Sequence, residues 1–261
     1  MIHSLEASIP TDNRTFRYGY GLFETMLVNN GQLQLANLHW ERLFSGLKKL
    51  HFDISPFFTP EKLEKEVLSS VHKNNLNRLC RVRLQVYASG GGIFDFKNNT
   101  PNYIIECFEL EQSVTLLNEN GLVVGLAKDV CKSMDSLSNL KSCNALVYAI
   151  AAIQSKEEKW NDALVTNSAG NIIESTIANI FWVKDNYIYT PPLSEGCVAG
   201  VMRRQILAQN TAIIEQPLTH EALLNADEVF LTNAIKKIKW VGRYGDVTYS
   251  NKIIKNLVGL L

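Results

Sequence analysis

The sequence predicts a mixed α/β fold. Two kinds of segment occur along the chain: runs rich in β-branched and aromatic residues, typical of strands, and segments whose apolar residues recur at helical spacing. Strands often follow one another without an intervening helix, which argues against a doubly wound parallel sheet. With 261 residues, 46% of them hydrophobic, the chain can bury the core of one large domain or of two smaller ones.

The first half is expected to hold a hairpin, two helices and two strands, in that order. An Asn-Asn-Gly turn joins the two arms of the hairpin, and Thr59 followed by proline is typical of a helix start. Three glycines end the strand that follows the helices. The expected ranges are 19–35 for the hairpin, 36–52 and 59–75 for the helices, and 78–92 and 102–110 for the strands.

A polar passage over residues 111–121 separates this half from the second, which is expected to be richer in strands. Its helices are predicted from apolar residues at helical spacing and its strands from β-branched and aromatic runs. The expected strands are 121–127, 162–167, 171–183, 187–192, 226–234 and 237–247, and the expected helices are 144–158 and 199–210.

Composition and charge exclude several classes of function. Lys+Arg and Asp+Glu both number 26, so no basic excess favours a nucleic acid. The five cysteines form no CxxC pair and the five histidines no close pair, so we expect neither disulfides nor a metal site. No apolar run is long enough to span a membrane, and the N-terminus lacks the pattern of a signal peptide. We therefore expect a cytoplasmic protein.

The common nucleotide and hydrolase motifs are also missing. Glu24 stands where the third glycine of a GxGxxG fingerprint would be, and the glycine-rich stretch after Ala88 lacks the GK[ST] of a P-loop. No GxSxG elbow occurs.

Glu174 lies between two β-type runs, just before a turn of small residues. A carboxylate in an apolar strand needs a partner. The residues around it follow a definite order: glutamate, small residue, Asn-aliphatic-aromatic, aliphatic-x-Thr, and aliphatic-x-Gly-aliphatic-x-basic. The residues that make up this order are Glu174, Thr176, Asn179, Ile180, Phe181, Ile188, Thr190, Val198, Gly200, Val201 and Arg203.

This order resembles the signature of class IV aminotransferases, the pyridoxal-phosphate (PLP) enzymes of fold type IV. "YGYGLFET" is similar to the family's "YGDGxFET", and "NLHWERL" to its "HLxRL". The resemblance runs from about residue 15 to about residue 250. It implies a D-amino-acid-aminotransferase-like fold with a smaller N-terminal α/β domain, a larger C-terminal cofactor-binding domain, and a homodimer. The composition change at the polar passage places the boundary between residues 1–112 and residues 113–261.

The resemblance assigns the two central roles to Lys141 and Glu174. Lys141, 33 residues before Glu174, would form the imine with PLP; the alternative is a surface lysine. Glu174 would pair with the protonated pyridine nitrogen and so maintain the ring as an electron sink. The alternative is a strand carboxylate that pairs with a neighbouring lysine.

The cofactor's phosphate has three candidate contacts. Arg42 matches the family's phosphate arginine, although an ion pair with Glu41 or a residue one turn away is an alternative. Val201 and Met202 lie where a helix begins, and free backbone N–H groups there favour an anion. Asn233 would donate a last hydrogen bond, or is an ordinary turn asparagine.

Substrate contacts are expected from Tyr18, Arg83 and Tyr87. Arg83 matches a substrate arginine of branched-chain aminotransferases and Tyr18 a pocket tyrosine of the same enzymes; an exposed strand charge is the alternative for Arg83. Aminodeoxychorismate lyases usually carry arginines around their glycine run, which the segment after Tyr87 lacks. Asn144 and "AGVMRRQ", however, resemble the lyases.

The resemblance therefore implies an aminotransferase that moves an amino group between a branched-chain-like amino acid and a 2-keto acid. Lys141, once released by the substrate, would act as the general base. The alternative is an aminodeoxychorismate lyase, which eliminates pyruvate to give 4-aminobenzoate. A non-catalytic PLP-binding relative is a third possibility, but such a protein would be expected to lack Lys141 or Glu174. The identity of the amino acid and its L or D form stay open.

Overall fold

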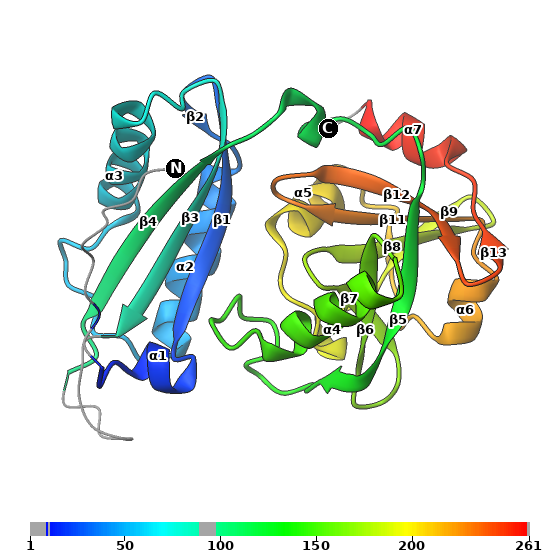
Figure 1. Cartoon of the computed structure of the whole chain (residues 1–261), viewed down its shortest axis with the longest axis horizontal. Helices are drawn as coiled ribbons and strands as arrows, with labels where there is room; N and C mark the ends of the chain where they lie inside the picture. Colours follow the sequence, from blue (N-terminus) through cyan, green and yellow to red (C-terminus); the bar gives the residue numbers. More distant parts are fainter. Residues whose placement is uncertain (1–8, 10, 89–97, 260–261) are drawn as a thin grey trace. The chain divides into compact units, whose positions relative to one another are not determined.

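The computed structural model describes residue 9, residues 11–88 and residues 98–259. It confirms the predicted mixed α/β fold (Figure 1). The chain forms two compact units: unit 1 comprises the chain up to Val114 together with Leu140–Ala145, and unit 2 comprises Thr115–Asn139 together with the chain from Leu146 onward. The predicted division after residue 112 would assign the short segment Leu140–Ala145, which contains Lys141, to the second domain. In the structure this segment belongs to unit 1.

Unit 1 contains a four-stranded antiparallel sheet in the order β2-β1-β3-β4, with helices packed against it (Figure 1). The hairpin is confirmed, but its second strand is only two residues long. Thr59 caps its helix as predicted, since its hydroxyl accepts from the N–H of Lys62. The predicted strand end at the three glycines lies outside the described residues. The elements are α1 (Arg14–Tyr18), β1 (Gly21–Asn29), β2 (Gln32–Leu33), α2 (Ala36–Lys49), α3 (Pro60–Lys73), β3 (Leu79–Ala88), β4 (Pro101–Glu109) and the 3₁₀ turn η1 (Gln112–Thr115).

Helix α2 packs closely on strand β1. Its buried residues recur at helical spacing and join the core of unit 1. Gly46 lies where the two elements come nearest, because a Cβ added there would be 2.7 Å from a methyl group of Leu22. This approach places Arg42, on the same helix, beside the next residues of β1.

The segment Leu140–Ala145 adds to the edge of β1. Strand β2 pairs only with the last two residues of β1, Val28 and Asn29. Near the start of β1 the returning segment pairs instead: the N–H of Phe23 donates to the carbonyl of Lys141 at 3.0 Å, and the N–H of Cys143 donates to Gly21 at 2.9 Å. Backbone hydrogen bonds therefore hold Lys141 at a fixed position along β1.

Unit 2 is a larger sheet in the order β10-β9-β8-β11-β12-β5-β6-β7, in which β7 also pairs with β8. This second pairing closes six of the strands into a barrel. The elements are β5 (Leu122–Lys132), α4 (Leu146–Glu157), β6 (Asp162–Asn167), β7 (Ile172–Ser175), β8 (Asn179–Lys184), β9 (Tyr187–Thr190), η2 (Leu193–Glu195), α5 (Val201–Gln209), β10 (Ile214–Glu215), α6 (His220–Leu224), β11 (Glu228–Asn233), β12 (Lys237–Tyr244), β13 (Val247–Thr248) and α7 (Lys252–Val258).

One prediction for this half was wrong. Residues 171–183 do not form a single strand; the predicted turn of small residues after Glu174 divides them, so that β7 and β8 are antiparallel neighbours with Glu174 opposite Asn179. Asp162 stabilises this turn, because its carboxylate accepts from the hydroxyls of Ser175 and Thr176. Helices α1, α6 and α7 were not predicted. No helix in the described part of the chain is both long and apolar enough to cross a membrane.

Candidate active site

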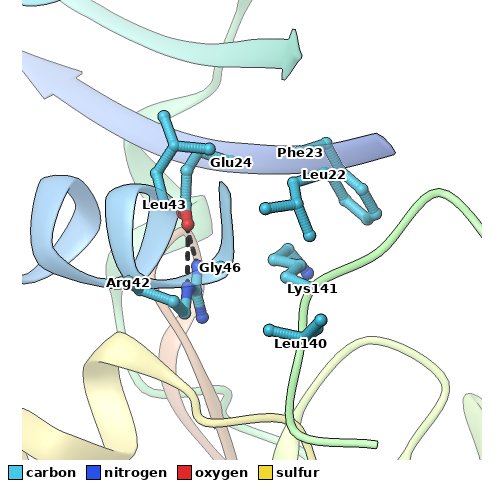
Figure 2. Close-up of a pocket in the computed structure, with 8 residues that line it drawn as sticks. All are labelled: Leu22, Phe23, Glu24, Arg42, Leu43, Gly46, Leu140 and Lys141. Carbon is cyan, nitrogen blue, oxygen red and sulfur yellow. Dashed lines mark hydrogen bonds and ion pairs between the residues drawn. The ribbon is translucent and has the colours of Figure 1, made fainter. Parts of the chain in front are cut away.

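Unit 1 has a small pocket beside the first half of β1 (Figure 2). Lys141 and Arg42 both line it, one from the segment paired with β1 and the other from α2. The structure therefore brings two of the predicted cofactor residues into one pocket. The pocket is lined by Leu22, Phe23, Glu24, Arg42, Leu43, Gly46, Leu140 and Lys141.

Arg42 is held by Glu24 on the adjacent strand. The Nε of Arg42 donates to Glu24 at 2.8 Å and an Nη donates to the other carboxylate oxygen, so the contact is bidentate (Figure 2). His39, one turn earlier on α2, also contacts Glu24 through Nδ1 at 2.6 Å. The described ion-pair partner of Arg42 is thus Glu24, across the α2–β1 interface.

The charges of this cluster follow from its burial. Burial by itself raises the pKa of Glu24, but the positive charge of Arg42 and the hydrogen bonds from His39 and Arg42 outweigh it and lower the pKa to about 2. Burial lowers the pKa of His39, against the opposing effect of Glu24. Glu24 is therefore ionised, and we assign His39 as a neutral imidazole whose Nδ1–H donates to it.

Phe23 connects Lys141 with a predicted substrate residue. The Nζ of Lys141 lies 4.5 Å from the centre of the Phe23 ring, and the guanidinium carbon of Arg83 lies 4.0 Å from the same centre. Arg83 is also tied to its own sheet, since it donates to Gln85 at 2.9 Å and lies 3.6 Å from a carboxylate oxygen of Glu106. One aromatic ring therefore contacts both cations.

The two predicted substrate tyrosines lie at the same end of the sheet. Tyr18 is the last residue of α1 and is 44% exposed. Tyr87 lies opposite Gly21, where β3 pairs with the start of β1.

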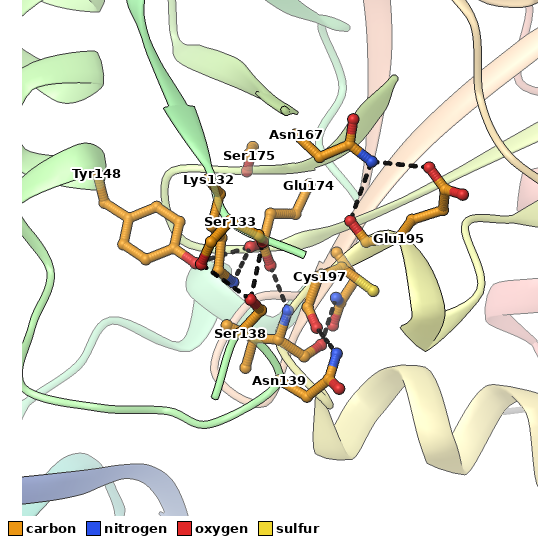
Figure 3. A network of polar contacts seen from close by, with 12 residues as sticks. Lys132, Ser133, Ser138, Asn139, Tyr148, Asn167, Glu174, Ser175, Glu195 and Cys197 are labelled. Atoms are coloured by element: carbon orange, nitrogen blue, oxygen red, sulfur yellow. Dashed lines mark hydrogen bonds and ion pairs between the residues drawn. The ribbon is translucent and has the colours of Figure 1, made fainter. Parts of the chain in front are cut away.

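In unit 2, Glu174 is buried at the junction of β6, β7 and β8, and three groups donate to its carboxylate (Figure 3). Lys132 Nζ and the Tyr148 hydroxyl each donate to Oε1 at 2.7 Å, and the backbone N–H of Val198 donates to Oε2 at 2.9 Å. The salt bridge with Lys132 is the neighbouring-lysine partner considered as the alternative for Glu174.

Two amide side chains hold the loop that carries Val198 and leads into α5. The amide of Asn139 donates to the carbonyls of Leu193 and Cys197, and that of Asn179 donates to Val198 at 2.9 Å. Gly200 fits beneath Asn179, because a Cβ added to it would be 1.8 Å from the Asn179 carbonyl oxygen. The loop and the start of α5 are therefore fixed relative to Glu174.

The other predicted phosphate contacts also lie in unit 2. Val201 and Met202 are the first two residues of α5, and no side chain caps this helix start, so its first N–H groups can receive an anion. Asn233 occupies a turn: its carbonyl oxygen accepts from Ile235 and Lys236, and its amide donates to Ile177 at 3.3 Å. These are the contacts of the turn asparagine considered as its alternative.

The residues present fit PLP. An ionised carboxylate has about four acceptor positions, so the three donors on Glu174 leave one on Oε2 within the described residues. A guanidinium and an amine share the unit 1 pocket, and an uncapped helix start offers N–H donors in unit 2. No group of three metal-ligating side chains occurs in the part of the chain that the structure describes.

Sequence reasoning missed several residues of these clusters. Glu24, His39 and Phe23 stand inside the two motifs quoted above, and the first two are ionisable residues on apolar faces, which was a usable signal. Lys132 and Tyr148 lie 42 and 26 residues from Glu174 along the chain. No local pattern connects them with it.

Three comparisons with known proteins agree on the kind of protein. The family model described as "Amino-transferase class IV" matches residues 21–243. The chain is 27% identical to an aminodeoxychorismate lyase of Vibrio harveyi, over 88% of this chain and 85% of that protein. It is 29% identical to a putative branched-chain-amino-acid aminotransferase of Methanocaldococcus jannaschii, over 89% and 81% of the two chains. The solved structure of a putative 4-amino-4-deoxychorismate lyase from Legionella pneumophila matches with a TM-score of 0.85 and 26% identity, covering 98% of this chain and 95% of that one.

Proposed function

The chain belongs to the class IV aminotransferase family, a family of PLP-dependent enzymes, and on this premise we propose that it is an aminotransferase. It moves an amino group between a branched-chain-like amino acid and a 2-keto acid. The observation that carries this proposal is the presence of Lys141 and Arg42 in one pocket, each held there by backbone pairing or a buried ion pair.

Each unit contributes residues with a role in this proposal. PLP, when bound, supplies an electron sink for negative charge at the substrate's Cα. Lys141 attaches the cofactor and, once released, moves the Cα proton, while Glu174 keeps the pyridine nitrogen protonated. Arg42 and the N–H groups of Val201 and Met202 bind the phosphate.

The remaining predicted residues support these groups. Asn233 completes the phosphate contacts. Arg83 binds a substrate carboxylate, and Tyr18 and Tyr87 contribute further substrate contacts from the same unit. The shared contact of Arg83 and Lys141 with the Phe23 ring supports this role, because it places a positive charge near the reactive amine.

Aminodeoxychorismate lyase is the second candidate. The similarity to the lyases of Vibrio harveyi and Legionella pneumophila favours it. A lyase uses the same proton abstraction by Lys141 and then expels a leaving group instead of transferring nitrogen. The residues assigned to the cofactor serve both reactions equally.

A half-reaction screen separates the two candidates. Purified protein loaded with PLP is mixed with L- and D-amino acids one at a time, and with aminodeoxychorismate, while the absorbance spectrum is followed. For an aminotransferase we expect at least one amino acid to convert the bound cofactor to its aminated form. Release of pyruvate and aminobenzoate without that conversion would instead establish the lyase.

We further propose that the protein is a homodimer in the cytoplasm. Leu146, Ile150 and Ile153 lie along one face of α4 and are 42–69% exposed, an apolar face that a second copy can cover. All five cysteines are free thiols, the usual state in a reducing compartment. Sedimentation of the wild-type protein and of an Ile150→Asp, Ile153→Asp variant tests the dimer; a monomeric wild-type protein contradicts it.

A further inference from the structure

The contacts of Glu174 differ from one another in charge. Lys132, the last residue of β5, contributes an ammonium group, whereas α4 contributes the Tyr148 hydroxyl and the loop before α5 a backbone N–H (Figure 3). The side chains of Lys132 and Glu174 are 12% and 4% exposed. Little water therefore reaches this ion pair, and its electrostatic attraction is weakly screened.

The two other side-chain groups beside Glu174 are neutral. Burial, and secondarily the charge of Glu174, raises the pKa of Tyr148, so its hydroxyl stays protonated and only donates. Burial and the same charge raise the pKa of the Cys197 thiol to about 12. The ammonium group of Lys132 is therefore the positive charge that contacts Glu174 directly.

The two kinds of donor have different effects on a carboxylate. A neutral donor fixes its orientation, while a cation in contact also favours its ionised form. Lys132 and Tyr148 both donate to Oε1, and among the described residues Val198 leaves one acceptor position on Oε2, while the contact with the Lys132 ammonium group favours a negative charge on the carboxylate. Glu174 can then accept a hydrogen bond from a cationic N–H without removing its proton.

We propose that Lys132 is a positioning residue that, through its ion pair, keeps Glu174 ionised and its Oε2 directed toward the pyridine nitrogen of PLP. This inference rests on the proposed function, since it concerns the partner of the ring nitrogen. The ion pair itself exists in the cofactor-free protein, so its two parts can be tested separately.

The first test measures the ionisation of Glu174 without cofactor. In protein labelled with ¹³C at the glutamate carboxyl carbon, the Glu174 resonance is the one missing from a Glu174→Gln spectrum. In Lys132→Gln, which keeps a hydrogen-bond donor but not the charge, we expect the titration midpoint of this resonance to rise by about one to three pH units relative to wild type. Lys132→Arg should restore the wild-type midpoint. Tyr148→Phe should change the midpoint by no more than about half as much as Lys132→Gln does. An unchanged midpoint in Lys132→Gln overturns the proposal.

A further variant guards against loss of folding. If Lys132→Gln does not fold, Lys132→Met, which has a similar length and no donor, is titrated instead, with the same expected rise. Should both Lys132 variants fail to fold, Glu174→Gln is added to each of them. If these double variants fold, the single variants lost stability because the Glu174 carboxylate had no cationic partner, as proposed. If they remain unfolded, Lys132 has another role and the proposal is wrong.

The second test concerns the cofactor. We expect Lys132→Gln to weaken PLP binding about tenfold or more, measured by equilibrium dialysis, and Lys132→Arg to bind within about threefold of wild type. A shifted Glu174 titration with unchanged PLP affinity would show that the ion pair does not act on the cofactor, which overturns the proposal. If wild-type protein binds no PLP while the titration shifts as expected, the proposed function fails and the ion pair stands.

Discussion

Two buried carboxylates, Glu24 in unit 1 and Glu174 in unit 2, have nearly the same bonding but different origins. Each accepts three side-chain or backbone hydrogen bonds, and each pairs with a cation whose side chain is 12% exposed. The partners of Glu24, however, lie 15 and 18 residues away on one helix. Those of Glu174 lie 24, 26 and 42 residues away on three separate segments.

The difference shows which group each cluster serves. Helix α2 contributes both partners of Glu24, so the carboxylate fixes the orientation of Arg42, which is the proposed ligand. Around Glu174 the relation is reversed, because Lys132 and Tyr148 fix the carboxylate, and the carboxylate is the proposed ligand. The same type of contact, a buried ion pair, thus positions a cation, Arg42, in unit 1 and an anion, Glu174, in unit 2.

Removing the supporting carboxylate should have the largest effect on stability. Glu24→Ala removes the buried carboxylate that pairs with Arg42 and His39, and we expect a loss of about 3–5 kcal/mol in the free energy of unfolding. Urea unfolding of the cofactor-free protein measures it. Glu41→Ala, on the exposed side of the same helix, is the control and should cost at most about 1 kcal/mol. Similar losses in both variants would contradict a structural role for the Glu24 cluster.

Replacing the second carboxylate should affect the reaction more than the fold. Glu174→Gln keeps the shape but not the charge, and we expect turnover to fall about 10²–10³-fold at saturating PLP, as for loss of one electrostatic contact to a transition state. Glu24→Gln should weaken PLP binding, and its turnover should recover when PLP is added in excess. Steady-state kinetics over a range of PLP concentrations distinguishes Glu174→Gln from Glu24→Gln. If the turnover of both variants responds to added PLP in the same way, the two clusters do not differ in the role proposed here.

The same difference explains how much the sequence could predict. The elements around Glu24 follow from local patterns: a hairpin with an Asn-Asn-Gly turn, and a helix whose apolar positions recur at helical spacing. Arg42 and Glu24 lie in adjacent motifs on these elements. Short-range periodicity therefore carried enough information to place one cluster, although the pairing itself was not recognised.

The surroundings of Glu174 depend on long-range contacts. The small residues after Glu174 predicted a turn, but Thr176-Ile177-Ala178 contains neither glycine nor proline, so this signal was too weak to divide residues 171–183 into two strands. Asp162, on β6, stabilises that turn through Ser175 and Thr176. The resemblance assigned Glu174 a role, but Lys132 and Tyr148, 42 and 26 residues away along the chain, become its neighbours only in the folded unit.

Acid should weaken the Glu24 cluster in a defined range. Because the pKa of Glu24 is lowered to about 2 in the folded protein, the cluster's contribution is full above the ordinary value of 4.5 and is lost as the pH falls toward 2. The lowered pKa of His39 acts in the same direction, starting below its ordinary value of 6.5. Urea unfolding at a series of pH values should therefore show the stability of wild type and Glu24→Gln converging as the pH falls below 4.5. A constant difference would mean that Glu24 carries no charge-dependent stability.

The smallest expected effect tests the long-range assembly around Glu174. Gly200, just before α5, has an extended backbone with a φ of −66°, which any residue can adopt, so a side chain there is excluded by space rather than by backbone conformation. Gly200→Ala forces Asn179 away from the carbonyl of Val198, and we expect a loss of about 1–3 kcal/mol in the free energy of unfolding together with weaker PLP binding. Adding Asn179→Ala removes the clashing amide, so the double variant should lose less than the sum of the two single changes. Strictly additive losses would show that Asn179 does not hold the loop at Gly200. Other contacts would then position the Val198 N–H against Glu174.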